Sequence, residues 1–424
     1  MRAYERFLNY VVIHTTSDDT STAVPSSQCQ FDLAKLLVDE MKEMGIEDAH
    51  VDEKCYVYGT IPATPGYEEV TPLGFCAHLD TAAFNGKNVK PRVIENYDGK
   101  DVTLGDSGRT LTADQFPHLP SMKGKTLIVT DGTTLLGGDD KAGIAEIMTL
   151  AERLMKGEIP HGKICLSFPP DEEIGAGAKD LDIGKYGATY AYTVDGSQVG
   201  LIDYENFNAA LAKIHITGLG VHPGSSKNTM INALLVANEL NNMLPSGETP
   251  RDTQGYEGFF HLTKLNGTPD DTDMEYIIRD HDRGLFEGRK KSLEHICVLL
   301  NDKYGDGTVK LHIRDQYYNM EEVIRQHFHL VENAIEAIHR VGLTHITRPI
   351  RGGTDGSQLS FRGLPCPNLG AGYYACHGPY EHVAAEDMDT VVEILMNLVG
   401  LYADAKEISA LLPKGANPLS VDLK

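Results

Sequence analysis

Short apolar runs alternate with longer amphipathic segments along the first half of the chain. Runs with the length and residue types of strands lie at 55–60, 73–79, 127–130, 163–168 and 189–194. Segments with apolar residues at helical spacing lie at 3–13, 31–44 and 142–155. Strands that alternate with helices predict an α/β fold, in which helices cover both faces of a mostly parallel sheet.

The pattern changes in the middle of the chain. Strand, helix, strand, strand, helix and strand are predicted in turn at 209–217, 229–244, 259–265, 274–279, 285–300 and 309–314. This order is the split unit of a ferredoxin-like domain. We therefore expect one α/β domain built from residues 1–208 and 319–424, interrupted by an inserted α+β domain at 209–318. Residues 410–424, with two prolines and a glycine, are expected to form a loose terminus.

Charge and cysteine content exclude several classes of protein. The chain has 424 residues, with 38 Lys and Arg against 61 Asp and Glu, so its net charge is −23. Nucleic acids and anionic membranes attract basic surfaces, so neither is an expected partner. The 7 cysteines include no CxxC pair, which argues against a disulfide framework and fits a reducing compartment. The first residues lack an apolar leader and no run has transmembrane length, so we expect a cytoplasmic protein.

Acidic residues and histidines follow several of the expected strands. His78 and Asp80 end the 73–79 run and share one face, where a carboxylate can hold the imidazole in one tautomer. A buried histidine that pairs with an acid explains this pair equally well. The motif 137–143 (GGDDKAG) opens a helix but lacks the Gly-Lys-Ser/Thr of a phosphate loop. Helix capping accounts for one of its two acids, Asp139 and Asp140, but not comfortably for both.

Three further segments contain acidic residues or a histidine, and each has an ordinary explanation when taken alone. Asp171, Glu172 and Glu173 follow the 163–168 run and could form a solvated loop. Asp195 precedes Gly196 as in a turn, and His377 lies in a Gly- and Pro-containing segment. A metal site explains all these positions at once. Imidazole with carboxylate suits Zn²⁺, a carboxylate can bridge two ions, and an acid that is not a ligand can serve as general base.

The ordered motifs resemble those of the M20 metallopeptidases, which are co-catalytic di-zinc exopeptidases and deacylases. The motifs that carry the likeness are His78-x-Asp80, 138–143, 171–175, Asp195 and His377. Within the family the chain is most similar to aminopeptidases that act on tripeptides, through the segments 5–10, 195–196, 205–208, 221–224, 276–280 and 351–356. The likeness runs from about residue 5 to about residue 405 and keeps the order and spacing of the motifs.

The resemblance implies a role for each matching residue. His78 and Asp195 would hold one Zn²⁺, Glu173 and His377 the other, and Asp139 would bridge them through its carboxylate. The metal could also be Co²⁺ or Mn²⁺. Asp80 would orient His78, Glu172 would act as general base and proton donor, and the 139–140 peptide bond would be cis.

The same resemblance implies a role for the inserted domain. It would serve as a lid and as the interface of a homodimer, with His222 supporting the developing oxyanion. Arg279 would bind the carboxylate of the peptide, and Arg351 would assist it. Ordinary surface ion pairs remain an alternative for both arginines, and a turn residue for His222. The implied reaction releases the N-terminal residue of a tripeptide.

Two other functions remain open from the sequence. The same metal site would serve a dipeptidase, a carboxypeptidase or an amide deacylase, which differ in the amide that lies over the metals. A non-catalytic binding module on the same fold is the alternative from another class. Because no expected ligand and no expected base is missing, the sequence favours an enzyme.

Overall fold

The chain divides into two compact units in the computed structural model, which describes residues 1–105 and 107–411, with side chains up to residue 404. The first unit contains residues 1–204, 322–347 and 354–424, and the second contains 205–321 and 348–353. The expected boundaries at 209 and 318 therefore shift outward by a few residues. The short segment 348–353, expected in the first domain, belongs to the second unit. Most of the expected loose terminus, residues 412–424, lies outside the described residues.

The first unit is built around a seven-stranded sheet. Its strands, in spatial order, are β1 (His50–Val51), β2 (Val57–Ile61), β8 (Ile164–Phe168), β3 (Leu73–Cys76), β9 (Tyr190–Gly196), β15 (Asn368–Gly370) and β10 (Ile202–Asp203). The four central strands β8, β3, β9 and β15 run parallel, and the outer strands pair antiparallel. Buried residues fill β8 and β3 completely, as expected for strands covered on both faces.

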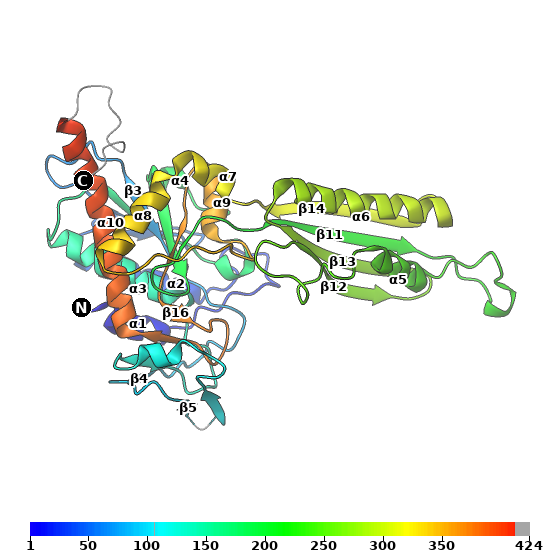
Figure 1. Ribbon diagram of the computed structural model, residues 1–424, viewed down its shortest axis with the longest axis horizontal. Helices are drawn as coiled ribbons and strands as arrows, with labels where there is room; N and C mark the ends of the chain where they lie inside the picture. Colours follow the sequence, from blue (N-terminus) through cyan, green and yellow to red (C-terminus); the bar gives the residue numbers. More distant parts are fainter. Residues whose placement is uncertain (106, 412–424) are drawn as a thin grey trace. The chain divides into compact units, whose positions relative to one another are not determined.

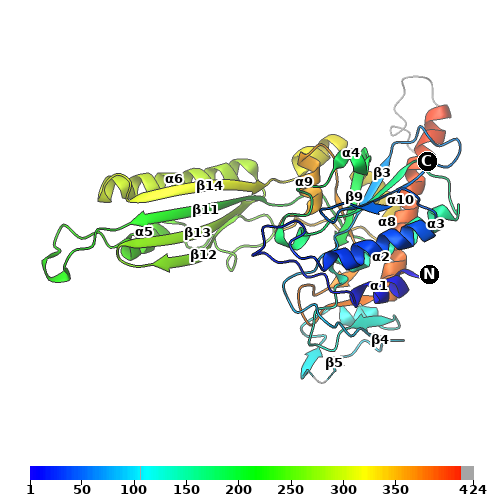
Figure 2. The same cartoon turned by 180° about the vertical axis from the view of Figure 1, so that it is seen from behind.

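Helices flank this sheet, as the alternating pattern predicts (Figures 1 and 2). They are α1 (Ala3–Val11), α2 (Gln30–Glu43), α3 (Gly138–Met155), α4 (Ile183–Tyr186), α7 (Glu321–Ile324), α8 (His329–Arg340), α9 (Asp355–Phe361) and α10 (Ala385–Leu411), with 3-10 turns η1 (Leu119–Met122), η2 (Glu172–Ile174) and η4 (Arg325–His327). Helices α1, α3 and α10 pack together, and α3 contacts β3 and β9. Along residues 1–105 and 107–411, no helix has both the length and the apolar character to cross a bilayer.

One of the strands expected in the parallel sheet belongs to a separate antiparallel sheet instead. The 127–130 run forms β7 (Leu127–Val129), but β7 lies outside the parallel sheet, between β17 (His382–Ala384) and β4 (Arg92–Ile94), with β16 (Tyr373–Tyr374) beside β17. A hairpin of β5 (Val102–Leu104) and β6 (Arg109–Leu111) adjoins it in sequence. The segment 346–350 forms only isolated bridges, at Ile346 and Ile350. Apolar runs this short specify a strand but not its partner.

The second unit is an antiparallel sheet covered by two helices on one face. Its strands, in order, are β12 (Phe259–Gly267), β13 (Asp271–Asp280), β11 (Asn208–Thr217) and β14 (Val309–Tyr317), with helices α5 (Ala233–Met243) and α6 (Arg283–Tyr304) and the turn η3 (Pro223–Ser225). Alternate residues of β11 and β13 face the helices and form one apolar core with them. Helix α5 is shorter than expected, because Asn232 caps it by accepting hydrogen bonds from the amides of Leu234 and Leu235.

A buried arginine ties α1 to two other helices. The Arg6 side chain is 4% exposed and pairs with Glu40 of α2 and Glu152 of α3. Burial raises the pKa of Glu152, but hydrogen bonds from Lys156 and Arg6 outweigh burial and lower it to about 2. Because the folded pKa lies below the unfolded value of about 4.5, ionised Glu152 stabilises the fold above pH 4.5.

This stabilisation should disappear as the pH falls from about 4.5 towards 2. The contribution lost is about 3 kcal/mol, so urea-unfolding free energies should fall less steeply with acid in Glu152→Gln than in the original chain. Glu158→Gln, which removes the partner of Arg153 on the surface, is the matched control and should keep the steep dependence. Equal slopes in all three proteins between pH 4.5 and 3 would contradict the assignment.

Candidate functional site

The ends of three neighbouring parallel strands bring the predicted residues together. His78 and Asp80 follow β3, Glu172 and Glu173 follow β8, and Asp195 lies near the end of β9. Strand β3 pairs in parallel with both β8 and β9, so the carboxyl ends of the three strands meet at one edge of the sheet. This edge is where open α/β sheets bind ligands. The main sheet therefore delivers most of the site, as the sequence pattern predicts.

Asp139 and His377 reach the same place from the second sheet of the first unit. Asp139 lies at the start of α3, after β7, and His377 lies in the turn between β16 and β17. A cis peptide bond joins Asp139 to Asp140, as the family resemblance implies. Gly143 allows α3 to approach β9, because a Cβ there would lie 1.9 Å from the Val194 carbonyl oxygen. The small residue in the 137–143 motif thus serves packing against the strand that carries Asp195.

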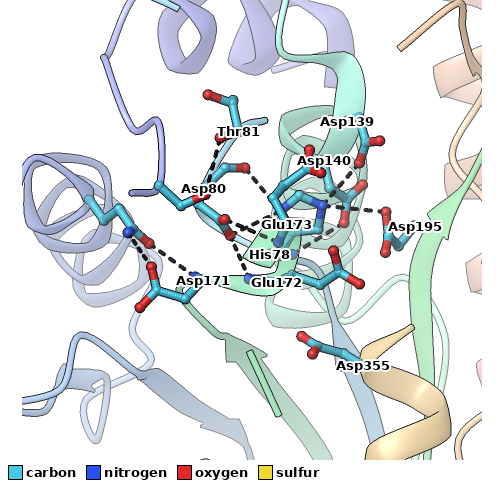
Figure 3. Close-up of polar contacts among 12 residues, drawn as sticks. His78, Asp80, Thr81, Asp139, Asp140, Asp171, Glu172, Glu173, Asp195 and Asp355 are labelled. Carbon is cyan, nitrogen blue, oxygen red and sulfur yellow. Dashed lines mark hydrogen bonds and ion pairs between the residues drawn. The ribbon is translucent and has the colours of Figure 1, made fainter. Parts of the chain in front are cut away.

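Asp139 lies between the two histidines. One carboxylate oxygen, Oδ1, is 2.9 Å from His78 Nε2, and the other, Oδ2, is 3.0 Å from His377 Nε2. His78 Nε2 is also 3.6 Å from Asp195 Oδ1, and His377 Nε2 is 3.0 Å from Glu173 Oε2. Figure 3 shows His78 facing Asp139 and Asp195 across the cluster. The five predicted metal ligands therefore lie in contact, with Asp139 placed between the two pairs.

Asp80 organises the site through the backbone as well as through His78. Its carboxylate accepts hydrogen bonds from the amides of Glu172, at 2.9 Å, and Glu173, at 3.2 Å (Figure 3). His78 Nδ1 lies 2.9 Å from the Asp80 carbonyl oxygen and 3.3 Å from its carboxylate. Asp80 is fully buried. One residue thus fixes both the imidazole of His78 and the turn that carries Glu172 and Glu173.

Two further buried acids, to which the sequence analysis gives no role, stabilise the turns that carry Glu172 and Asp139. Asp171 accepts hydrogen bonds from the amide and hydroxyl of Ser26 and from the Gln30 side chain, at 2.6–2.7 Å. Glu381 accepts from the amides of Leu136, Gly137 and Asp139 at 2.7–3.0 Å. Asp171 lies in the 171–175 motif and Glu381 lies shortly after His377. The hydrogen-bond partners of both acids are distant in the sequence. These contacts anchor the turns that present Glu172 and Asp139.

Asp355 is a third acid that the sequence did not assign. It begins α9, in the 351–356 motif, and accepts a hydrogen bond from the Ala178 amide at 2.7 Å. Gly177 makes room for it, since a Cβ there would lie 2.4 Å from Asp355 Oδ2. Figure 3 places Asp355 beside Glu172 and Asp195. Its negative charge adds to that of the cluster.

Carboxyl groups in the cluster outnumber imidazoles, and their pKa values respond to the crowding. Burial raises the pKa of Asp195 to about 7 and raises that of Glu172 well above its ordinary value, in both cases with help from neighbouring acids. Hydrogen bonds to Asp139 and Glu173 raise the pKa of His377 to about 11. A site of this kind demands positive charge, which protons or bound cations can supply.

The donor atoms fit divalent cations. Buried oxygens of Glu173, Asp140 and Asp355 have no hydrogen-bond partner among the described residues. Donor atoms of His78, Asp140 and Asp195 lie within 4.8 Å of one another, as do those of His78, Asp139 and Glu173, and those of Asp139, Cys376 and His377. Imidazole and carboxylate are the ligands of zinc hydrolase sites. The residues present therefore suit a pair of metal ions that share Asp139.

The three predicted substrate residues lie in the second unit. His222 is exposed, and its Nδ1 accepts a hydrogen bond from the Gly224 amide at 3.1 Å, which leaves the ring proton on Nε2. Arg279, on β13, donates to the carbonyls of Ala210 and Ile278. Arg351 donates to the carbonyls of Gly255 and Glu257 and to the Thr253 hydroxyl, and stacks on Phe207 and Phe259. These contacts favour a structural role for Arg351, whose substrate role stays a prediction.

Comparison with known proteins places the chain in a family. The model of peptidase family M20/M25/M40 matches residues 131–400. Peptidase T of Halothermothrix orenii is 50% identical over 405 residues, covering 95% of this chain and 99% of the relative. The structure of a tripeptidase from Staphylococcus aureus superposes with a TM-score of 0.75 at 22% identity, covering 95% of this chain and 98% of that one.

A more distant structure shares the same fold. A dinuclear metal-binding peptidase of the M20 family from Bacillus subtilis superposes with a TM-score of 0.63 at 14% identity, covering 95% of this chain and 99% of that one. The family model, the close relative and the fold agree with the motifs of the sequence. The chain therefore belongs to peptidase family M20/M25/M40 and, within that family, to the peptidase T proteins.

Proposed function

We propose that this chain is a metallo-aminopeptidase that releases the N-terminal residue of tripeptides. The observation that carries the proposal is the placement of Asp139 between His78 and His377, with Asp195 and Glu173 on either side. Relatives 50% identical over almost the whole chain bear the name peptidase T, and a protein of the same fold is a tripeptidase. Both support the substrate class.

The metal centre we propose contains two Zn²⁺ ions. His78 and Asp195 would hold one, Glu173 and His377 the other, and Asp139 both. A bound zinc pair supplies Lewis acidity and an ionised water near neutral pH. The dinuclear centre of the Bacillus subtilis protein supports two ions rather than one.

Glu172 is the proposed general base. Its backbone amide is fixed by Asp80, while its carboxyl lies beside the metal-ligand cluster (Figure 3). Glu172 accepts the proton of the attacking water and then delivers it to the departing amine. Burial and the negative charge of Asp195 raise the pKa of Glu172 well above its ordinary value. Asp80 positions Glu172 and orients His78 for this purpose.

We propose that three residues of the second unit bind the substrate. The Nε2–H of His222 is available to donate to the oxyanion, since Nδ1 is held as an acceptor. Arg279 would bind the peptide carboxylate, with Arg351 as a weaker candidate. We further propose that the second unit acts as a lid and as the interface of a homodimer.

We also propose that the enzyme works in the cytoplasm. All seven cysteines are free thiols in the structure, which fits a reducing compartment.

Product analysis tests the proposed reaction. Zinc-loaded protein is incubated with a dipeptide, a tripeptide, a tetrapeptide, an N-acetylated tripeptide and a tripeptide amide, with Glu172→Ala as control. Release of the first residue from the free tripeptide, absent in the control, is the expected result. Cleavage at the carboxyl end, or of the acetylated peptide, would identify a carboxypeptidase or a deacylase instead. No cleavage of any peptide would favour a binding module.

Arg279→Ala tests how the carboxylate is recognised. A charged hydrogen bond contributes about 1.5–3 kcal/mol, so KM for a tripeptide should rise by about 10- to 100-fold with little change in kcat. The tripeptide amide, which lacks the charge, should be affected far less. Arg351→Ala is the matched comparison, and its tight contacts within the second unit predict reduced stability rather than a selective KM effect. An unchanged KM in Arg279→Ala would rule out its proposed role.

A further inference from the structure

One row of paired residues crosses all four strands of the second unit (Figure 1). Ala209 of β11 lies opposite both Arg279 of β13 and Tyr317 of β14, and Arg279 also lies opposite Phe259 of β12. Side chains of directly opposite residues share one face of a sheet. The row belongs to the face away from α5 and α6, because Ile278, the residue before Arg279, lies in the core that these helices cover.

Arg279 and Tyr317 are in contact within this row. Arg279 Cζ lies 5.4 Å from the centre of the Tyr317 ring, which is a cation–π contact. Ala209, which lies between them, carries only a methyl group and leaves the two larger side chains together. Gly353 packs against the same ring, since a Cβ there would lie 2.8 Å from Tyr317 Cε1 and Cζ. The fold of the second unit therefore holds a phenol beside this guanidinium.

Arg279 is a half-buried cation without an acidic partner among the described residues. Its Nη1 donates to two backbone carbonyls, at 2.9 and 3.2 Å, which fixes the guanidinium in place. Three further N–H groups remain on Nε and Nη2. Burial lowers the pKa of Arg279, and no acid contributes to the shift. Arg289, which is also half-buried, pairs instead with Asp280 and Glu248. An unpaired cation withdrawn from water is costly until an anion binds it.

We propose that the Tyr317 hydroxyl binds the carboxylate of the peptide together with Arg279, an inference that rests on the proposed peptidase activity and on the proposed role of Arg279. A guanidinium can donate two parallel hydrogen bonds to one carboxylate, and a phenol O–H can donate a third. Tyr317 is thereby a specificity-determining residue. It favours peptides with a free carboxylate over peptide amides, because an amide has one accepting oxygen and no negative charge.

The adjacent tyrosine has a different setting and supplies the matched control. The Tyr318 hydroxyl donates to Asp315 at 2.9 Å, and the Arg283 guanidinium lies 3.7 Å from the centre of its ring. Tyr318 also packs against the core beneath α5 and α6, on the other face of the sheet from Arg279. The same chemical change at the two neighbouring tyrosines therefore removes two hydroxyl groups with different surroundings.

Kinetics of the full-length, zinc-loaded protein test the proposal. Tyr317→Phe keeps the ring beside Arg279 and removes only the hydroxyl, so KM for a free tripeptide should rise by about 10- to 100-fold with little change in kcat. KM for the amide of the same tripeptide, or its inhibition constant if it is not cleaved, should change by less than about twofold. Tyr318→Phe should leave both constants within about twofold of the original chain. Far-ultraviolet circular dichroism checks that each variant is folded.

A double variant tests whether the two donors serve one carboxylate. In the Arg279→Ala background, Tyr317→Phe should raise KM for the free tripeptide by less than about a further twofold, because the carboxylate is no longer held beside the hydroxyl. The full 10- to 100-fold rise in that background, about the value expected for an independent charged hydrogen bond, would overturn the shared site.

The outcomes separate this proposal from the proposed function. An unchanged KM in Tyr317→Phe, or an equal rise for the tripeptide amide, would overturn the role of the hydroxyl and leave the peptidase and Arg279 intact. If Arg279→Ala itself leaves KM unchanged, the carboxylate site is wrong and Tyr317 is wrong with it. If the original chain cleaves no tripeptide, the proposed function is wrong, and the inference that rests on it is overturned as well.

Discussion

Replacing Glu172 with glutamine is expected to lower kcat for a tripeptide by about 10²–10⁴-fold while both metal ions stay bound. The magnitude is that of removing a positioned general acid–base group. The backbone should stay in place, because Asp80 holds the Glu172 amide and not its side chain. Glutamine preserves the size of the side chain but cannot accept the proton. Kinetics together with elemental analysis of bound zinc measure both quantities.

The neighbouring acid supplies the matched comparison. Glu173→Gln removes a proposed ligand in contact with His377, so it should reduce bound metal as well as activity. The same chemical change, one residue apart, is thus expected to give two different signatures. A loss below tenfold in Glu172→Gln, or equal metal loss in both variants, would refute the division of roles.

Asp139→Ala is expected to abolish binding at both metal sites. Each carboxylate oxygen faces a different histidine, so its removal deprives both proposed ions of a shared ligand. Activity should fall to background, and added zinc should no longer stabilise the protein. In the original chain, free zinc at about 100 times its Kd stabilises the fold by about 2.7 kcal/mol. Zinc stoichiometry and thermal unfolding with and without zinc provide the readouts.

Single-histidine variants test whether Asp139 is shared. His78→Ala and His377→Ala should each weaken one site and leave the other able to bind zinc. Residual stoichiometry near one ion per chain in these variants, and near zero in Asp139→Ala, is the expected pattern. If Asp139→Ala also retains about one ion, the carboxylate belongs to a single site and does not bridge.

The sequence predicts the part of the site that depends on strand order. His78, Asp80, Glu172, Glu173 and Asp195 follow apolar runs, and parallel strands bring their ends to one edge. Asp139 lies in the same cluster, but it comes from a different sheet. Strand β7, which precedes it, belongs to an antiparallel sheet with β17, and its three apolar residues could not specify that partner.

The supporting acids could not be assigned from sequence for a related reason. Glu381 binds backbone amides more than 240 residues away, and Asp171 binds side chains more than 140 residues away. A hydrogen bond to a backbone amide requires no particular residue at the partner position, and the side-chain partners of Asp171 lie far from it in the sequence. The contacts of Arg351 in the second unit are equally hard to predict, because the two carbonyl groups that accept its hydrogen bonds lie 94 and 96 residues away in the sequence.

The second unit is discontinuous in the sequence, and this determines which residues a separately prepared fragment must contain. The hexapeptide 348–353 belongs to it, although the stretch 322–347 intervenes. A gene fragment that encodes 205–321 alone would omit Arg351, leave the carbonyls of Gly255 and Glu257 without their donor, and uncover the rings of Phe207 and Phe259. A soluble fragment of the second unit would therefore need 348–353 joined to 205–321 by a designed linker. A fragment of the first unit would need two further junctions, between residues 204 and 322 and between residues 347 and 354.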